Sequence, residues 1–215
     1  MTQSRKTLPL YTKIEQFDID KLRNEFSIRG YLDPSLNFDQ LNFSNSAEDQ
    51  KMLHYIQTQK REKYSKWFDF STYSNLYILR FNDQFDFPEH NMKNIYHTQI
   101  FKQEVKDTFK GTYIEQVINR IKAQYTKIDK AYLARLDPHT ELKYHIDFDT
   151  AKISKVHIPI LTSPDSEFKW IKDKREIRQH FEADGAAWWL NIGIPHGVDN
   201  NADTHRFHLI VEVYI

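Results

Sequence analysis

The C-terminal residues show the clearest pattern of apolar and polar positions in the chain. From Arg206 to Ile215 the two kinds of residue alternate, as the two faces of a β-strand require. One face is apolar throughout: Phe207, Leu209, Val211, Val213 and Ile215. The other carries Arg206, His208, Ile210, Glu212 and Tyr214. The pattern predicts a strand whose apolar face packs against the rest of the protein.

A different period, close to 3.6 residues, marks the middle of the chain. Its apolar positions recur at i, i+3, i+4 and i+7 and predict an amphipathic helix over 113–125: Ile114, Val117, Ile118, Ile121 and Tyr125. A second, short helix is expected over 18–28, with Asp18 as its cap. Weaker patterns predict strands over 8–14 and 75–81, a helix within 48–68, and loops over 31–45 and 82–94.

From residue 128 onward the chain breaks into short strand-like runs separated by turn residues. Eight such runs begin near Lys130, Leu142, Ser154, Glu167, Lys174, Ala186, Ile194 and His205. Helices followed by eight short strands indicate an α+β protein whose second half is a double-sheet jelly roll. No linker separates the halves. We therefore expect a single domain over 1–215, in which a mainly helical region, 1–127, supports a barrel core, 128–215.

Composition excludes several classes of protein. The 215 residues include 30 basic and 30 acidic side chains, so no net charge attracts nucleic acid or an anionic membrane. There is no cysteine, which excludes disulfides and cysteine–zinc sites. No apolar run is long enough to cross a membrane or to act as a signal sequence. We expect a cytoplasmic protein that binds neither nucleic acid nor membrane, and the sequence does not indicate its oligomeric state.

One set of residues in the strand-rich half suggests a metal site. His145 and Asp147 stand at i and i+2, so on a strand they project from the same face. His196 precedes a turn region at 199–203 and supplies a candidate third ligand. Arg206 follows ten residues later, and a hairpin centred on Asn201 would place it opposite His196.

Two histidines and one carboxylate form the facial triad of non-haem Fe(II) oxygenases, which leaves other metal positions open. The planar fork of an arginine near such a metal binds a carboxylate in bidentate fashion. A dicarboxylate that binds the metal with its keto-acid end and Arg206 with its far carboxylate matches 2-oxoglutarate. Two alternatives stay open: a zinc hydrolase, since the same ligands suit zinc with an open water, and a non-catalytic jelly-roll module that binds metal. A hydrolase, however, gives Arg206 no required role.

The same residues carry a resemblance to a known family. The stretch 155–160 (KVHIPI) and the ending, PHGV at 195–198 and HRFHLIVEV at 205–213, resemble the aspartyl/asparaginyl β-hydroxylases, which are Fe(II)- and 2-oxoglutarate-dependent dioxygenases. The likeness covers roughly residues 113–215.

The resemblance implies a double-stranded β-helix, a cupin-like jelly roll, and a role for each site residue. It implies that His145, Asp147 and His196 bind iron and that Arg206 pairs with the C5 carboxylate of 2-oxoglutarate. His157 matches a position that touches this cosubstrate, although it would equally suit a core histidine bonded to the backbone. Lys155 stands where the family often has arginine. We expect the Arg206 face to line the mouth of the barrel near His196.

The implied activity is hydroxylation of an amino acid or amino-acid side chain with O2, releasing succinate and CO2. The substrate would be a small molecule or peptide that carries an amino-acid group, and the sequence does not identify it further.

Overall fold

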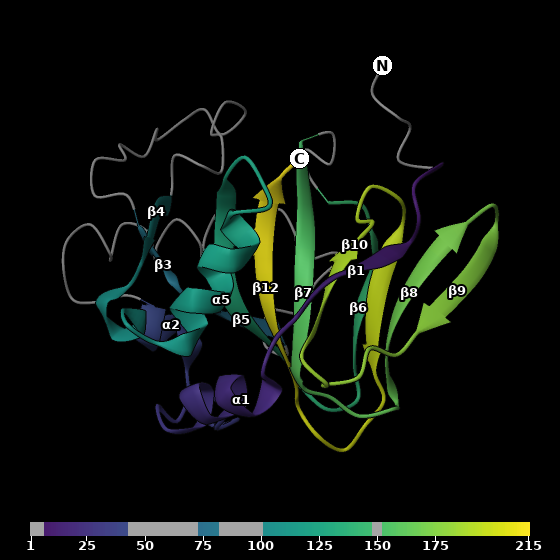
Figure 1. Cartoon of the computed structure of the whole chain (residues 1–215). Coiled ribbons are helices and arrows are strands. Elements are labelled where there is room, and N and C mark those ends of the chain that lie inside the picture. The colour runs from purple at the N-terminus through teal and green to yellow at the C-terminus, as the bar shows by residue number, and fades with distance from the viewer. Residues whose placement is uncertain (1–6, 43–72, 82–100, 148–151) are drawn as a thin grey trace, which may run out of the picture.

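Two β-sheets face each other and enclose the interior of the molecule (Figure 1). The structure, a computed structural model, describes residues 7–42, 73–81, 101–147 and 152–215. Apolar residues from both sheets meet between them, among them Leu136 and Leu190 of one sheet and Phe168 and Val198 of the other. This arrangement is the jelly roll that the strand pattern predicts.

The larger sheet has six strands in the order β1-β10-β7-β12-β5-β2, all paired antiparallel. Its strands are β1 (Tyr11–Gln16), β2 (Tyr73–Tyr77), β5 (Ile128–Leu136), β7 (Ile153–Leu161), β10 (Ala186–Leu190) and β12 (Arg206–Tyr214). The central strand β12 lies between β5 and β7, so both faces of the alternating segment are covered.

The smaller sheet has four antiparallel strands in the order β6-β11-β8-β9. They are β6 (Thr140–His145), β8 (Ser166–Lys172), β9 (Arg175–Gln179) and β11 (His196–Asn200). A separate hairpin-like pair joins β3 (Leu79–Phe81) to β4 (Phe101–Val105). All eight strands expected after residue 128 are therefore confirmed.

The helices cover the outer face of the larger sheet. Helix α5 (Tyr113–Lys122) lies against β12, and its four buried apolar residues join Phe207, Leu209, Val211 and Val213 in one core (Figure 1). Helix α1 (Ile19–Ser27) packs on α5 and β7, and the Asp18 side chain caps it by accepting a hydrogen bond from the Lys21 amide. Two shorter elements are α2 (Phe38–Asn42) and a 3₁₀ helix, η5 (Asp107–Phe109).

The N-terminal region differs from its prediction in three ways. Strands β1 and β2 extend the larger sheet at its two edges, so the sheet recruits residues from well before residue 128. The expected strand over 75–81 is two strands that belong to different sheets, and α2 lies inside the expected loop 31–45. The helix predicted within 48–68 and the loop over 82–94 fall outside the described residues. None of the helices in the described segments is long and apolar enough to cross a membrane.

Candidate metal centre

The three predicted metal ligands come together on neighbouring strands of the smaller sheet. His145 ends β6, Asp147 follows two residues later, and His196 begins β11 directly opposite His145. One ligand atom from each residue lies within 4.8 Å of the other two. His145 Nε2 is 3.4 Å from Asp147 Oδ1, and His196 Nε2 is 3.8 Å from Asp147 Oδ2. A single metal ion can therefore contact all three side chains.

Backbone carbonyls fix the orientation of both imidazole rings. His145 Nδ1 donates to the carbonyl of Lys143 at 2.7 Å, and His196 Nδ1 donates to the carbonyl of Ile194 at 3.0 Å. Because a carbonyl can only accept, each Nδ1 donates its proton there, and each ring presents its Nε2 toward the Asp147 carboxylate. Burial lowers the pKa of His196 to about 4, so this ring is neutral, the state that binds metal.

The Asp147 carboxylate is charged and paired. Its Oδ2 lies 2.6 Å from the Lys155 ammonium, which comes from β7 of the opposite sheet. Burial alone would raise the pKa of the Asp147 carboxyl, but the Lys155 charge and the nearby imidazoles hold that pKa well below its usual range. The third ligand is thus an anion within the barrel.

A second polar group lies deeper on the inner face of the larger sheet. Arg206 is only 5% exposed, and within the described residues no acidic side chain pairs with it. Its Nη2 lies 3.1 Å from His208 Nδ1. Burial lowers the pKa of Arg206 to about 10, which leaves a guanidinium ion charged at neutral pH. The predicted hairpin that would place Arg206 opposite His196 is wrong, because β11 and β12 belong to different sheets and Arg206 is paired with Leu136 of β5.

His157 lies between these two groups. Both of its ring nitrogens are buried without a hydrogen-bond partner among the described residues. Burial, and then the positive charges of Arg206 and Lys155, lower the pKa of His157 well below its usual value, so the ring is neutral. The alternative of a core histidine bonded to the backbone is wrong, because neither nitrogen has such a bond. Buried polar atoms without partners are expected where a ligand binds.

A model of the aspartyl/asparaginyl beta-hydroxylase family matches residues 41–214. The chain belongs to this family. The match reaches some seventy residues further toward the N-terminus than the resemblance seen in the sequence, which began near residue 113.

Solved structures with a similar fold are distant. A Pseudomonas putida prolyl-4-hydroxylase is 10% identical, with a TM-score of 0.47, over 95% of this chain and 91% of its own. A cupin domain from Bordetella pertussis is 19% identical, with a TM-score of 0.31, over 39% of this chain and 79% of its own. A 2OG-Fe(II) oxygenase family oxidoreductase from Burkholderia pseudomallei is 16% identical, with a TM-score of 0.34, over 40% of this chain and 44% of its own. A search of curated protein sequences finds no match.

The residues of this family member fit the groups that the family implies. Two imidazoles and one carboxylate make a ligand set suited to Fe(II). Nearby, the unpaired guanidinium of Arg206 and the partnerless nitrogens of His157 suit an anion. Both halves of the expected site are therefore present in the described part of the chain.

Sequence reasoning missed the charged residues behind Asp147. Glu212 accepts hydrogen bonds from Lys130 at 2.8 Å and from the Tyr132 hydroxyl at 3.0 Å, and it lies 3.8 Å from Lys155. The available signal was that Glu212 shares the face of β12 with Arg206. The partners of Glu212 follow only from the strand register, which places it opposite Lys130 and Lys155.

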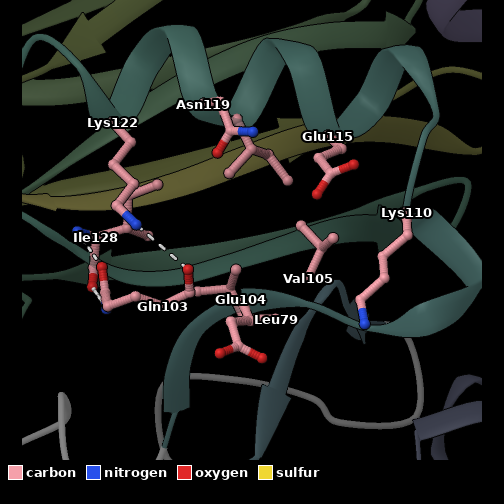
Figure 2. A pocket seen from close by; sticks show the side chains of 10 residues that line it. Leu79, Gln103, Glu104, Val105, Lys110, Glu115, Asn119, Lys122 and Ile128 are labelled. Atoms are coloured by element: carbon pink, nitrogen blue, oxygen red, sulfur yellow. Dashed lines mark hydrogen bonds between the residues drawn. The ribbon is translucent and has the colours of Figure 1, made fainter.

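The hydroxylase fold also has a pocket on its outer side, unrelated to this centre. This pocket, of about 250 Å³, lies between α5 and the strands β4 and β5. Figure 2 shows Glu115 and Asn119 pointing into it from the helix. Its lining includes none of the predicted site residues.

Proposed function

We propose that this family member is an Fe(II)- and 2-oxoglutarate-dependent dioxygenase. It would hydroxylate an amino acid or an amino-acid side chain and release succinate and CO2. The observation that carries the proposal is the combination of the His145–Asp147–His196 cluster with Arg206, a buried cation without an acidic partner among the described residues. Membership of a hydroxylase family supports the reaction class.

The protein's part at the metal is to fix three ligands. His145 and His196 present Nε2 because their Nδ1 atoms are bound to carbonyls, and Asp147 supplies the one anionic ligand. Bound iron supplies the redox chemistry that couples decarboxylation of the cosubstrate to oxidation of a C–H bond. The barrel wall around the ligands limits access of water, since His196 is only 3% exposed.

Arg206 gives the site its selectivity for a dicarboxylate. An unpaired guanidinium in an apolar interior is costly, and a carboxylate that forms two parallel hydrogen bonds to it offsets that cost. We assign the far carboxylate of 2-oxoglutarate to Arg206. His157, neutral and without partners, would meet the cosubstrate between Arg206 and the metal ligands. A zinc hydrolase has no use for this second group.

The substrate is proposed only by class. Family membership supports an acceptor that carries an amino-acid group, either as a small molecule or within a peptide.

The test is succinate formation from 2-oxoglutarate, with Fe(II) and O2, in the wild type and two variants. Asp147→Ala removes the anionic ligand and should lower succinate formation by about 100-fold or more, because metal affinity and geometry both suffer. Asp203→Ala removes an exposed aspartate and is the matched control, with unchanged turnover expected. Undiminished turnover in Asp147→Ala would show that the three residues are not the metal centre.

A further inference from the structure

The two oxygens of the Asp147 carboxylate have different surroundings. Oδ1 lies 3.4 Å from the ligand atom of His145. Oδ2 lies 2.6 Å from Lys155 Nζ and 3.8 Å from His196 Nε2. This ammonium is the nearest cation to Oδ2 among the described residues, and the two groups form a close ion pair. In the same part of the chain, no lysine or arginine forms an ion pair with Oδ1.

Lys155 also lies close to a second acidic residue, Glu212. Its ammonium lies 3.8 Å from Glu212 Oε1, the same oxygen that accepts from the Tyr132 hydroxyl. The other carboxylate oxygen, Oε2, is bound to Lys130. The strand register explains this order, because Glu212 of β12 is directly opposite Lys130 of β5 on one side and Lys155 of β7 on the other.

The ion-paired side chains behind Asp147 are buried or mostly buried. Glu212 and Lys130 are less than a tenth exposed, and the Lys155 side chain is 18% exposed. Burial strengthens each pairing and leaves the Lys155 ammonium no comparable partner in water. Lys155 is therefore fixed in place rather than free to reach a cosubstrate.

We infer that Lys155 is a positioning residue that holds Oδ2 of Asp147, so that this carboxylate binds the metal through Oδ1 alone, and that Glu212 holds Lys155 in that place. The inference rests on the proposed function, and it reassigns Lys155 from binding the cosubstrate to controlling the metal. One oxygen from Asp147, instead of two, keeps a metal position open for a chelating keto acid.

The inference predicts that loss of Lys155 increases the metal affinity, whereas loss of an active-site side chain usually decreases it. Lys155 repels a metal dication through its charge, and it also prevents the second oxygen of Asp147 from binding. Removing it should therefore tighten metal binding in the absence of cosubstrate, by about tenfold or more, although an active-site side chain has been lost. Removing the charge of Glu212 leaves the site more positive and should weaken metal binding by about threefold to tenfold.

The experiment titrates Co(II) anaerobically, without 2-oxoglutarate, into wild type, Lys155→Met and Glu212→Gln. Calorimetry gives the affinity, and the visible Co(II) spectrum reports the coordination number. We expect tighter binding and an altered spectrum for Lys155→Met, and weaker binding for Glu212→Gln. Lys169→Met is the control, because Lys169 is also a buried lysine in ion pairs, but its partners at 2.5 Å are Glu141 and Asp199 rather than a metal ligand.

The outcomes separate this inference from the proposed function. If the wild type binds Co(II) but Lys155→Met binds it with unchanged or lower affinity, the positioning role is wrong and the metal centre stands. A wild type that binds no Co(II) overturns both. Should Lys155→Met fail to fold, Lys155→Gln replaces it, since this variant also removes the charge, and unchanged or lower affinity there contradicts the inference.

Discussion

At the scale of single residues, burial determines what the polar side chains of this barrel can do. Arg206 and His157 are both buried; among the described residues Arg206 has no acidic partner, and neither ring nitrogen of His157 has a hydrogen-bond partner. Asp147 differs, since a lysine from the other sheet forms an ion pair with one of its oxygens. The contrast distinguishes residues available to bind a ligand directly from residues whose position is set by another side chain.

Arg206→Ala should weaken 2-oxoglutarate binding by about 2–5 kcal/mol, because the far carboxylate would lose its buried cation. Metal binding should stay nearly unchanged. Arg206→Lys should recover only part of the affinity, since a point charge cannot reproduce the two-pronged contact of the guanidinium. The measurement is calorimetric titration of 2-oxoglutarate into the Mn(II)-loaded variants.

Arg120→Ala serves as the control for that series, because Arg120 is half exposed on α5 and pairs with Glu15 at the surface. Equal affinities for wild type and Arg206→Ala would leave Arg206 as an ordinary strand residue. The preference for an oxygenase over a zinc site would then lose its main support.

At the scale of elements, the sequence predicted the helix and the strand whose apolar residues recur at a regular spacing. Alternation identified β12, and a 3.6-residue period identified α5, because each buries one complete face. Pairing is not local, so nothing in residues 11–16 or 73–77 showed that they form the edges of the larger sheet. Helix α2 has only five residues, too few for a period to appear within the loop predicted there.

The contact between β6 and β11 depends on Gly197. The β6–β11 register shifts between His196 and Val198, and a Cβ on Gly197 would lie 2.5 Å from the Leu142 carbonyl oxygen. Gly197→Ala should therefore push β6 away, reduce stability by about 1–3 kcal/mol and weaken metal binding about tenfold, since His145 is carried on β6. Thermal unfolding and Co(II) titration measure the two effects.

Gly30→Ala is the control for this strand contact. Gly30 has a φ of +72° and no atom within 4 Å of an added Cβ, so alanine there costs about 1 kcal/mol of backbone strain. It should leave metal affinity unchanged. A Gly197→Ala protein that binds metal as tightly as wild type would show that β6 tolerates the displacement.

At the scale of the whole molecule, the site is assembled from both sheets. The metal ligands belong to the smaller sheet and to the residues just after β6, whereas Lys155, His157, Glu212 and Arg206 belong to the larger one. Spacing in the sequence could identify each set separately. It could not predict that Lys155 reaches Asp147, because that contact crosses the barrel and depends on how the two sheets face each other.

The packing of three neutral histidines inside one barrel predicts how stability depends on pH. Burial lowers the pKa of His196 to about 4 and the pKa values of His157 and His208 well below normal. In the unfolded chain these rings take up protons near pH 6.5, so below that pH the unfolded state binds more protons than the folded state. The free energy of unfolding of the metal-free protein should therefore be nearly constant, as far as these groups are concerned, above pH 6.5. It should fall as the pH drops below that value.

His208→Asn tests this dependence without losing the contact to Arg206, because the amide oxygen can accept in place of Nδ1. Each neutral histidine contributes up to about 1.4 kcal/mol per pH unit to the acid slope, so the variant should lose stability less steeply than wild type between pH 6.5 and 5. Urea unfolding across that range measures the slopes. Parallel slopes would mean that His208 becomes protonated in the folded barrel, which its burial beside the Arg206 charge should prevent.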